Sequence, residues 1–327
     1  MTGATILVTG AGGYIGSQTV LALQDAQHRV VGLDDLTVGR PELLELSDRV
    51  LVADCRDTAR LRAIFEAEDI AGVVHCAALA VVAESVAAPT RYLDVNVGGL
   101  LNVLGRAVEH GGVPVVFSSS GTVYGDPTAT SGLLAEGHAV APVHAYGLSK
   151  RIGEQALAFE NHASGLRSVA LRYFNAAGAD LAGRAGEWHQ GPESRVLPRL
   201  LGAAQRGLPF ELAGDDFGTP DGTCVRDFVH VVDVARAHLQ ALDYLRSGGP
   251  SRVLNIGAGL GTSVLQLVAE VERVTGKTLP LRIGPRRPGD VARLVADVRE
   301  ADATLGWRPE LTLGDIVKSA ASWHAQR

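Results

Sequence analysis

The stretch Thr9-Gly10-Ala11-Gly12-Gly13-Tyr14-Ile15-Gly16 decides how the rest of this 327-residue sequence is interpreted. It follows an apolar run, residues 4–8, and precedes a predicted helix that ends near residue 27. Gly10, Gly13 and Gly16 permit a tight turn, a close approach of the backbone to a pyrophosphate and close packing of the helix on its strand. The helix N-terminus can then receive the phosphates. The pattern alone leaves an ordinary glycine-rich turn open as an alternative.

A second apolar run, residues 29–33, ends in Asp34, eighteen residues beyond Gly16. A carboxylate at this place can accept hydrogen bonds from the ribose hydroxyls of NAD, and it would repel a 2′-phosphate. Asp35 stands beside it and competes for the same assignment. Because a strand–helix–strand unit surrounds these residues, the sequence predicts dinucleotide binding, with NAD preferred over NADP.

Composition narrows the class of protein. Hydrophobic residues make up 46% of the chain and charged residues 20%, which suits a sizeable core. The formal net charge of −6 argues against non-specific binding of nucleic acid. The three cysteines, Cys55, Cys76 and Cys224, form no CxxC pair, so we expect a reducing compartment and no metal site. No signal peptide and no apolar run of about 20 residues is visible, which predicts a cytoplasmic protein without membrane contact.

Strand and helix patterns alternate through the first half of the chain. The expected strands are 4–9, 29–34, 49–53, 71–76, 113–119 and 167–173, and the expected helices are 13–27, 57–67, 89–110 and 145–163. Such alternation predicts a parallel sheet with helices on both faces and ligands outside the carboxyl ends of its strands. The predicted fold class is α/β, a Rossmann-type doubly wound parallel sheet with a smaller mixed α/β substrate-binding region.

The pattern breaks between residues 176 and 223, where glycine, proline and charged residues predict loops that carry specificity. The regular segments expected after it are a strand at 229–232, a helix at 233–246 with Asp233 as its N-cap, a strand at 252–256, a helix at 263–275 and two short helices within 277–327. We therefore predict an NAD-binding domain from 1–175 plus about 226–260. The substrate-binding domain is expected from about 176–225 plus 261–327.

Three residues suggest a catalytic site. Ser120 follows an apolar strand, and Tyr146 and Lys150 stand four residues apart, on one face of a predicted helix. Taken separately, the serine could be a turn residue and the Tyr–Lys pair a surface pair. Behind a dinucleotide-binding turn they are typical of a hydride-transfer site. The phenol of tyrosine has a pKa near 10, and a neighbouring ammonium favours its deprotonation to a base.

The chain resembles the extended short-chain dehydrogenase/reductase family and, within it, the UDP-hexose 4-epimerases. The resemblance runs from Ile6 to about Trp323. The segments that carry it are Val8 to Ser17, Leu33 to Leu36, Ser118 to Gly125, Tyr146 to Lys150, Leu171 to Asn175, Asp221 to Val231 and Pro285 to Asp290. Their order and spacing together are specific, whereas few of them are specific singly.

The resemblance implies roles for individual residues. Tyr146 would be the catalytic base, Lys150 its partner and the anchor of the nicotinamide ribose, and Ser120 the hydroxyl that assists. The implied cofactor-binding residues are Gly10, Gly13, Tyr14, Ile15, Gly16, Asp34, Asp35, Asp54, Cys55, Ala77, Ala78, Asn96, Ser118, Tyr146, Lys150 and Tyr173. The implied substrate-binding residues are Ser120, Tyr146, Asn175, Arg195, Val196, Arg226, Arg287 and Asp290. Guanidinium groups suit a diphosphate, and a carboxylate suits a ribose diol.

The implied activity is NAD-dependent 4-epimerisation of a UDP-hexose, with UDP-glucose and UDP-galactose as the expected substrates. The reaction would pass through a 4-keto sugar that turns over and takes back the same hydride. The resemblance also implies a homodimer that uses the helices at 89–110 and 145–163.

Ala80, Arg195 and Leu294 depart from the family pattern and leave the sugar open. The alternatives are a UDP-N-acetylhexosamine, a UDP-uronic acid or another NDP-sugar. A related dehydratase or decarboxylase is disfavoured because Gly121 and Thr122 supply no acid. A catalytically silent NAD-binding regulator is the non-enzyme alternative, and the intact set of Ser120, Tyr146 and Lys150 argues against it.

Overall fold

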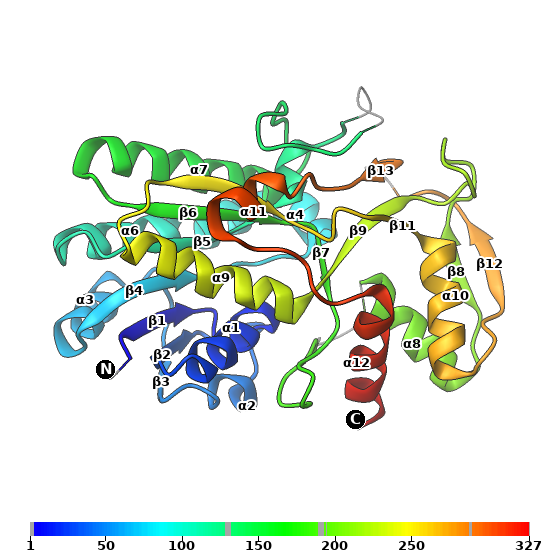
Figure 1. Ribbon diagram of the computed structural model, residues 1–327, viewed down its shortest axis with the longest axis horizontal. Coiled ribbons are helices and arrows are strands. Elements are labelled where there is room, and N and C mark those ends of the chain that lie inside the picture. Colours follow the sequence, from blue (N-terminus) through cyan, green and yellow to red (C-terminus); the bar gives the residue numbers. More distant parts are fainter. Residues whose placement is uncertain (1–2, 128–131, 189–192, 194, 288–289, 327) are drawn as a thin grey trace.

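A seven-stranded parallel sheet occupies the left-hand part of the molecule in the view of Figure 1. The computed structural model describes residues 3–127, 132–188, 193, 195–287 and 290–326. The strand order is β10-β6-β5-β4-β1-β2-β3, and every neighbouring pair is parallel. The strands are β1 (Thr5–Thr9), β2 (Arg29–Asp34), β3 (Arg49–Val52), β4 (Ile70–His75), β5 (Val115–Ser120), β6 (Ser168–Tyr173) and β10 (Arg252–Ile256). This topology confirms the predicted fold class.

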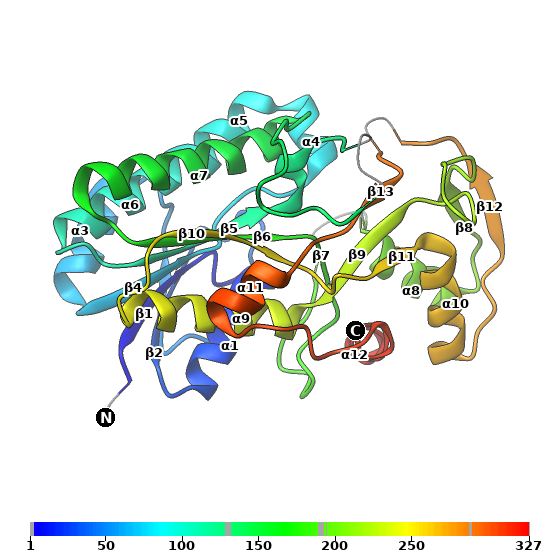
Figure 2. The same ribbon diagram turned by 45° about the horizontal axis from the view of Figure 1, so that its top comes forward.

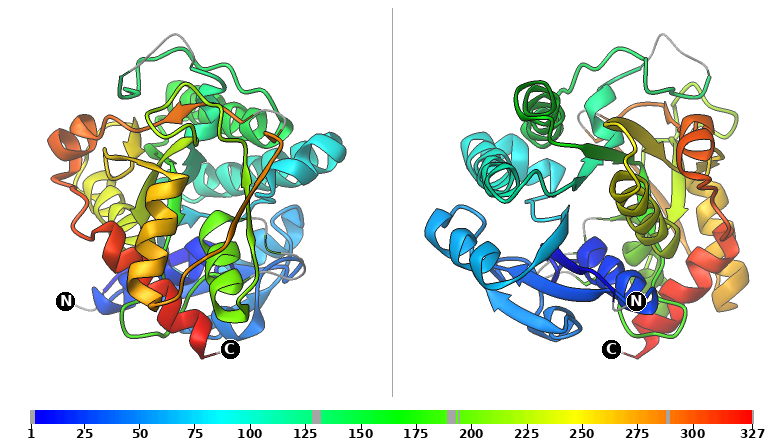
Figure 3. Two further views of the ribbon diagram at one scale, coloured as in Figure 1. Left: turned by 90° about the vertical axis from the view of Figure 1, so that its right-hand side faces the viewer. Right: turned by 60° about the vertical axis from the view of Figure 1, so that its left-hand side comes forward.

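Helices cover both faces of this sheet (Figure 3). On one face lie α3 (Thr58–Ala67), α6 (Gly99–Glu109) and α7 (Ala145–Ser164), and on the other lie α1 (Tyr14–Asp25), α9 (Val231–Arg246) and α11 (Arg299–Leu305). The short helices of this part are α2 (Pro41–Leu44), α4 (Val82–Ala87) and α5 (Pro89–Leu93). Within β1, Ile6 and Val8 enter one apolar core and Leu7 enters the other, since alternate strand residues face opposite sides. Burial on both faces explains the uninterrupted apolar runs of the sequence.

The helix expected over residues 89–110 is interrupted. A π-helical turn, Asp94–Gly98, separates α5 from α6. Such turns are frequent at functional sites. The turn carries Asn96, which is buried near the carboxyl end of the sheet.

Elements from separated parts of the chain build a second unit, here called the small-sheet region (Figure 2). Its strands are β7 (Asn175–Ala177), β8 (Phe210–Ala213), β9 (Val225–His230), β11 (Gly261–Ser263), β12 (Leu281–Gly284) and β13 (Arg293–Leu294). Its helices are α8 (Val196–Arg206), α10 (Val264–Thr275) and α12 (Leu313–Ala325). Strand β9 pairs with β7, β11 and β13, and β8 pairs with β12.

Two sequence-based predictions are wrong in this region. Residues 176–223 are not all loop, because they include α8 and β8. The apolar face of α8, with Leu197, Leu200 and Leu201, is buried in a core that α10 and α12 complete. The strand expected at 229–232 is β9, which starts four residues earlier, at Val225, and ends at His230. The glycines and prolines on either side of α8 made its helical periodicity hard to recognise in the sequence.

Asp233 is not the N-cap of its helix. His230 occupies that position, and its Nδ1 accepts the N–H of Val232 at 3.1 Å. The carboxylate of Asp233 instead accepts the N–H groups of Glu310, at 3.1 Å, and Leu311, at 3.0 Å. Asp233 therefore ties α9 to the segment before α12, a long-range contact that local sequence does not reveal. No helix in the described ranges is long and apolar enough to cross a bilayer.

Candidate active site

The glycine-rich turn between β1 and α1 leaves no room for a side chain at Gly10 or Gly16. Gly10 has a φ of +72°, and a Cβ placed on it would lie 2.6 Å from the backbone nitrogen of Ala77. A Cβ on Gly16 would lie 2.0 Å from the carbonyl oxygen of Gly10. Helix α1 begins at Tyr14, and the capping residue, Gly13, offers no side chain to its first N–H groups. Those donors suit the diphosphate of a dinucleotide, so the turn fits NAD.

Asp34 lies at the end of β2 beside this turn. Its Oδ2 accepts the N–H of Gly12 at 2.9 Å, and its Oδ1 accepts the N–H of Leu36 at 2.8 Å. Burial raises the pKa of Asp34 above the usual value of an aspartate, although these two backbone donors oppose the shift. Asp35 is exposed, and its carboxylate accepts the N–H of Thr37 at 2.9 Å. Of the two candidates for the ribose carboxylate, Asp34 is therefore the one fixed to the glycine-rich turn.

Asp54 and Cys55 follow β3 at the same edge of the sheet. The Asp54 carboxylate pairs with Arg56 at 2.6 Å, and this partner lowers the pKa of Asp54. Cys55 is buried against α6, and burial raises the pKa of its thiol to about 12. The side chain of Cys55 therefore contributes to packing, and its thiol is not a reactive group.

Asn96 joins the segment after β4 to α7. Its Oδ1 accepts the N–H of Leu79 at 2.8 Å, and its Nδ2 donates to the Leu79 carbonyl and to Ser149 Oγ, both at 3.0 Å. These bonds hold Ala77 and Ala78, which immediately precede Leu79, beside the catalytic helix candidate α7. Within the structure Asn96 has a positioning role.

Ser120, Tyr146 and Lys150 meet at the carboxyl end of β5. Ser120 ends that strand, and its Oγ accepts the N–H of Thr122 at 3.2 Å. Tyr146 is the second residue of α7, and Lys150 follows one turn later. The Lys150 ammonium lies 5.8 Å from the ring centre of Tyr146 and 5.0 Å from that of Phe117. Lys150 is only 3% exposed, so this Tyr–Lys pair is not a surface pair.

The electrostatics of this group are set by burial. Burial lowers the pKa of Lys150 to about 8. Burial raises the pKa of Tyr146, while a hydrogen bond from Ser120 and the positive charge of Arg195 lower it. The sequence suggested Lys150 as the cation that acts on Tyr146, and the contribution of Arg195 was missed because it depends on a contact from another part of the chain.

Ser118 and Tyr173 lie on the adjacent strands β5 and β6. Their hydroxyl groups form a hydrogen bond, and the Tyr173 hydroxyl also lies 3.4 Å from Nε2 of His238. Both side chains are buried. Burial raises the pKa of Tyr173, and it raises that of the Cys76 thiol to about 12 against the positive charge of Lys150.

Apart from Ser120 and Tyr146, the residues expected to hold the substrate lie in or next to the small-sheet region. Arg226, on β9, donates to the carbonyl of Val291 at 2.8 Å and lies 3.4 Å from Asp290. Arg195 occupies the N-cap position of α8, directly before Val196. Its guanidinium group pairs with Glu187 at 3.0 Å, and its Cζ lies 5.4 Å from the ring centre of Tyr14. Asn175 starts β7.

Two arginines of the small-sheet region also lie near each other. Burial lowers the pKa of Arg199, a residue that the sequence did not single out, and the charge of Arg287 lowers it further. Leu294, which departs from the family pattern, packs against a small core of Val123, Tyr124 and Leu134.

A buried ion pair fixes α7 to the sheet. Arg172, on β6, binds both carboxylate oxygens of Glu154 at 2.7 and 2.8 Å, and Ser119 on β5 donates to the same carboxylate at 2.7 Å. The side chains of Arg172 and Glu154 are only 3% and 1% exposed. Glu154 follows Lys150 by one helical turn, so this pair positions the helix that carries Tyr146 and Lys150. Sequence analysis missed it, although the four-residue spacing from Lys150 was a usable signal.

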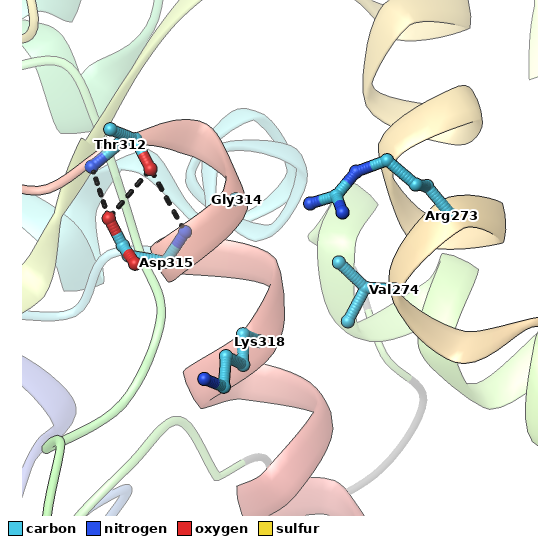
Figure 4. A pocket seen from close by; sticks show the side chains of 6 residues that line it. All are labelled: Arg273, Val274, Thr312, Gly314, Asp315 and Lys318. Carbon is cyan, nitrogen blue, oxygen red and sulfur yellow. Dashed lines mark hydrogen bonds between the residues drawn. The ribbon is translucent and has the colours of Figure 1, made fainter.

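A separate recess of about 460 Å³ lies between α10 and α12 (Figure 4). It is lined by Arg273, Val274, Thr312, Gly314, Asp315 and Lys318. None of the predicted site residues lines it, so it is not the candidate active site. Among the described residues no group of three His, Cys, Asp or Glu side chains is arranged to hold a metal ion.

Comparison with known proteins identifies the family. The model of the NAD dependent epimerase/dehydratase family matches residues 6–257. The chain belongs to that family. Within it, the chain is 43% identical to a UDP-glucose 4-epimerase of Rhizobium leguminosarum bv. trifolii over 327 residues, which cover 100% of this chain and 99% of that protein. It is 41% identical to the UDP-glucose 4-epimerase of Lacticaseibacillus casei, over 98% of this chain and 96% of that protein.

Solved structures of family members have the same fold. The UDP-glucose 4-epimerase of Stenotrophomonas maltophila, with bound NAD and formylated UDP-arabinopyranose, aligns with a TM-score of 0.94 and 38% identity, over 99% of this chain and 98% of that one. The enzyme of Bifidobacterium longum, in complex with NAD⁺ and UDP, aligns with a TM-score of 0.91 and 34% identity, over the same shares.

The comparisons confirm the predicted family, the NAD cofactor and the activity of an isomerase, a UDP-hexose 4-epimerase. The roles of individual residues and the two domain boundaries remain predictions.

Proposed function

We propose that the protein interconverts UDP-glucose and UDP-galactose at the carboxyl edge of the seven-stranded sheet, using Ser120, Tyr146 and Lys150. The observation that carries this proposal is the meeting of these three side chains beside the glycine-rich turn. In the proposed division, residues 1–175 and about 226–260 hold NAD, and residues about 176–225 and 261–327 hold the UDP-sugar.

The NAD site is proposed from groups whose donors or acceptors suit a dinucleotide. The open N-terminus of α1 would hold the diphosphate, and Asp34 the adenosine ribose. Lys150 would donate to the nicotinamide ribose, since no described hydrogen bond or ion pair gives its ammonium an oxygen partner. NAD held there would supply the acceptor, and later the donor, of the hydride at C4 of the sugar.

Tyr146 would hold the proton of the reaction. It removes the proton from the 4-hydroxyl group and later gives it back, so its phenolate must be reachable near neutral pH. Burial opposes this, because it raises the pKa of Tyr146. Ser120 and Arg195 both favour the phenolate, and Ser120 can also donate to the sugar oxygen.

The UDP moiety would supply most of the binding energy. Arg226 is held in place by the carbonyl of Val291 and can present the rest of its guanidinium group to the diphosphate. Arg287 supplies a second cation, and Asp290 a carboxylate for the uridine ribose. Firm contacts on UDP combined with few on the hexose would let the keto sugar turn over while it stays bound.

A UDP-uronic acid is the second candidate substrate. The observation that favours it is the positive charge of Arg195 beside Tyr146, which could attract a sugar carboxylate. The panel of substrates described below separates the two.

A homodimer is part of the proposal. Large apolar side chains are exposed on α6 and α7, including Leu101 at 48%, Leu148 at 40% and Phe159 at 74%. Pairing of these helices with those of a second copy would cover them. A cytoplasmic location is proposed from the thiols of Cys55, Cys76 and Cys224, which are free.

The deciding experiment incubates purified protein with a panel of UDP-hexoses, UDP-N-acetylhexosamines and UDP-uronic acids, without added cofactor, and resolves the epimers. Tyr146→Phe should lower turnover more than about tenfold with little loss of UDP-sugar binding, because it removes only the proton carrier. Tyr244→Phe, on α9, is the matched control and should leave turnover near that of the wild type. Equal turnover in wild type and Tyr146→Phe would remove Tyr146 from the mechanism.

A further inference from the structure

An arginine and a tryptophan far apart in the sequence meet beside the glycine-rich turn. Arg40 stands just before α2, and its N–H donates to the carbonyl of Gly12 at 2.9 Å. Its guanidinium carbon lies 3.7 Å from the ring centre of Trp188. This distance is well inside the limit of about 6 Å for a cation–π contact. Arg40 thus links the turn that is expected to receive the cofactor diphosphate to the segment that precedes α8.

Within the described part of the chain, no carboxylate neutralises the charge of Arg40. Among the described residues, no carboxylate forms a salt bridge with it, and its Nε is buried without a hydrogen-bond partner. A planar guanidinium group usually binds carboxylates or phosphates through its edge, and a buried donor without a partner is costly. Here an indole covers one face of the group. The backbone of the same residue is bonded to a turn whose geometry suits phosphates.

The segment that ends at Trp188 is fixed by contacts of its other residues. The carbonyl of the preceding residue, Glu187, accepts the indole N–H of Trp323 at 2.9 Å, which links the segment to α12. The Glu187 carboxylate pairs with Arg195, and Arg195 lies over the ring of Tyr14. Tyr14 in turn donates its hydroxyl to the carbonyl of Gly178 at 2.7 Å. The segment from Gly178 to Trp188 is therefore fixed against the first residue of α1.

We propose that Arg40 and Trp188 form a clamp that retains NAD, with Arg40 supplying a cation for the dinucleotide diphosphate and Trp188 holding that cation in place. The proposal rests on the NAD site of the proposed function. An epimerase that oxidises and then reduces the same sugar must keep its cofactor through both half-reactions. Slow release of the dinucleotide therefore serves the reaction even though neither residue contacts the sugar.

Dissociation of NADH tests the clamp. NADH is bound to cofactor-free protein, excess NAD is added, and the fall of NADH fluorescence gives the release rate. Arg40→Ala and Trp188→Ala should each release NADH about tenfold faster, the factor expected from losing one desolvated cation–π contact. Trp188→Phe keeps an aromatic face and should stay closer to wild type than Trp188→Ala.

Arg184→Ala is the matched control. Arg184 belongs to the same segment and pairs with Asp25 on α1 at 2.9 Å, but it does not contact the glycine-rich turn. Its removal should leave the release rate unchanged. Unchanged release in Arg40→Ala and Trp188→Ala, or equally fast release in Arg184→Ala, would overturn the clamp.

The two proposals fail in different ways. Wild-type protein that binds no NADH would contradict the NAD site itself. Wild-type protein that retains NADH but does not epimerise UDP-hexoses would contradict only the substrate assignment, and the release rates would still decide the clamp.

Discussion

The region around the seven-stranded sheet, here called the sheet region, and the small-sheet region each contain a buried charged side chain whose surroundings differ from those of the other. Asp227, on β9, is fully buried, yet its carboxylate accepts the N–H groups of Ala258, Gly259 and Ala296 at 2.6, 3.1 and 3.0 Å. Lys150, at the edge of the large sheet, is almost as buried, and no described residue gives its ammonium an oxygen partner. A charge satisfied by backbone donors organises loops. A buried charge left without a partner indicates a place for a ligand.

A third buried charge provides the largest expected effect, because it is paired with another side chain. Arg172→Met leaves the Glu154 carboxylate buried without its guanidinium partner. We expect the free energy of unfolding to fall by about 3–5 kcal/mol, measured by urea denaturation. Arg151→Met removes the more exposed partner of Glu154, at 3.3 Å, and should cost far less. Similar losses in the two variants would mean that burial does not govern the strength of these pairs.

Lys150→Met should stabilise the NAD-free protein while abolishing epimerisation. The pKa of Lys150 falls from 10.5 to about 8 in the folded chain, so at pH 7 its charge costs the fold about 3 kcal/mol. The variant should gain that amount in free energy of unfolding at pH 7. The gain should shrink as the pH rises from about 8 to about 10.5, where the wild-type lysine loses its proton in both states.

Lys318→Met, at an exposed position of α12, is the control and should show no such gain. A loss of stability in Lys150→Met at pH 7 would mean that Lys150 has a structural partner, as Asp227 has.

Asp227→Asn should remove a pH dependence of opposite sign. Burial raises the pKa of Asp227 to about 6, despite its three backbone donors. Its contribution to stability is therefore complete below about pH 4 and is lost as the pH rises to about 6, because only the unfolded chain ionises in that window. Subtracting the unfolding free energies of the variant from those of wild type across pH 4–7 should reveal a fall of about 2–3 kcal/mol. A flat difference would show that the ionised carboxylate is fully compensated by its backbone donors.

Of the variants considered, Arg195→Met is expected to have the smallest effect. The charge of Arg195 lowers the pKa of Tyr146, so its removal should raise that pKa. The acid limb of the pH–rate profile should move to higher pH by about one unit or less. Arg199→Met removes a cation one turn further along α8 and should not move the limb. A shift to lower pH in Arg195→Met would contradict the assigned direction.

The sheet region was predictable because its strands are buried on both faces and alternate with helices. The positions of Ser120, Tyr146 and Lys150 also followed from local spacing, since a strand end and one helical turn were enough to define them. The small-sheet region was harder to predict from the sequence. Strand β8 finds its partner β12 about 70 residues later, and α8 buries its apolar face only because α10 and α12 supply the other side. Arg195, Glu154 and Arg40 act through contacts of the same long-range kind.

The buried pair of Glu154 and Arg172 has one further consequence for catalysis. A helix packed on a sheet can slide along its own axis, and a shift of one residue would displace Tyr146 by about 1.5 Å. Glu154 lies eight residues beyond Tyr146 and is bound through both oxygens to a strand, which prevents such sliding. The alignment of the phenol with a bound sugar is therefore determined about 12 Å away from the reaction, where no substrate reaches.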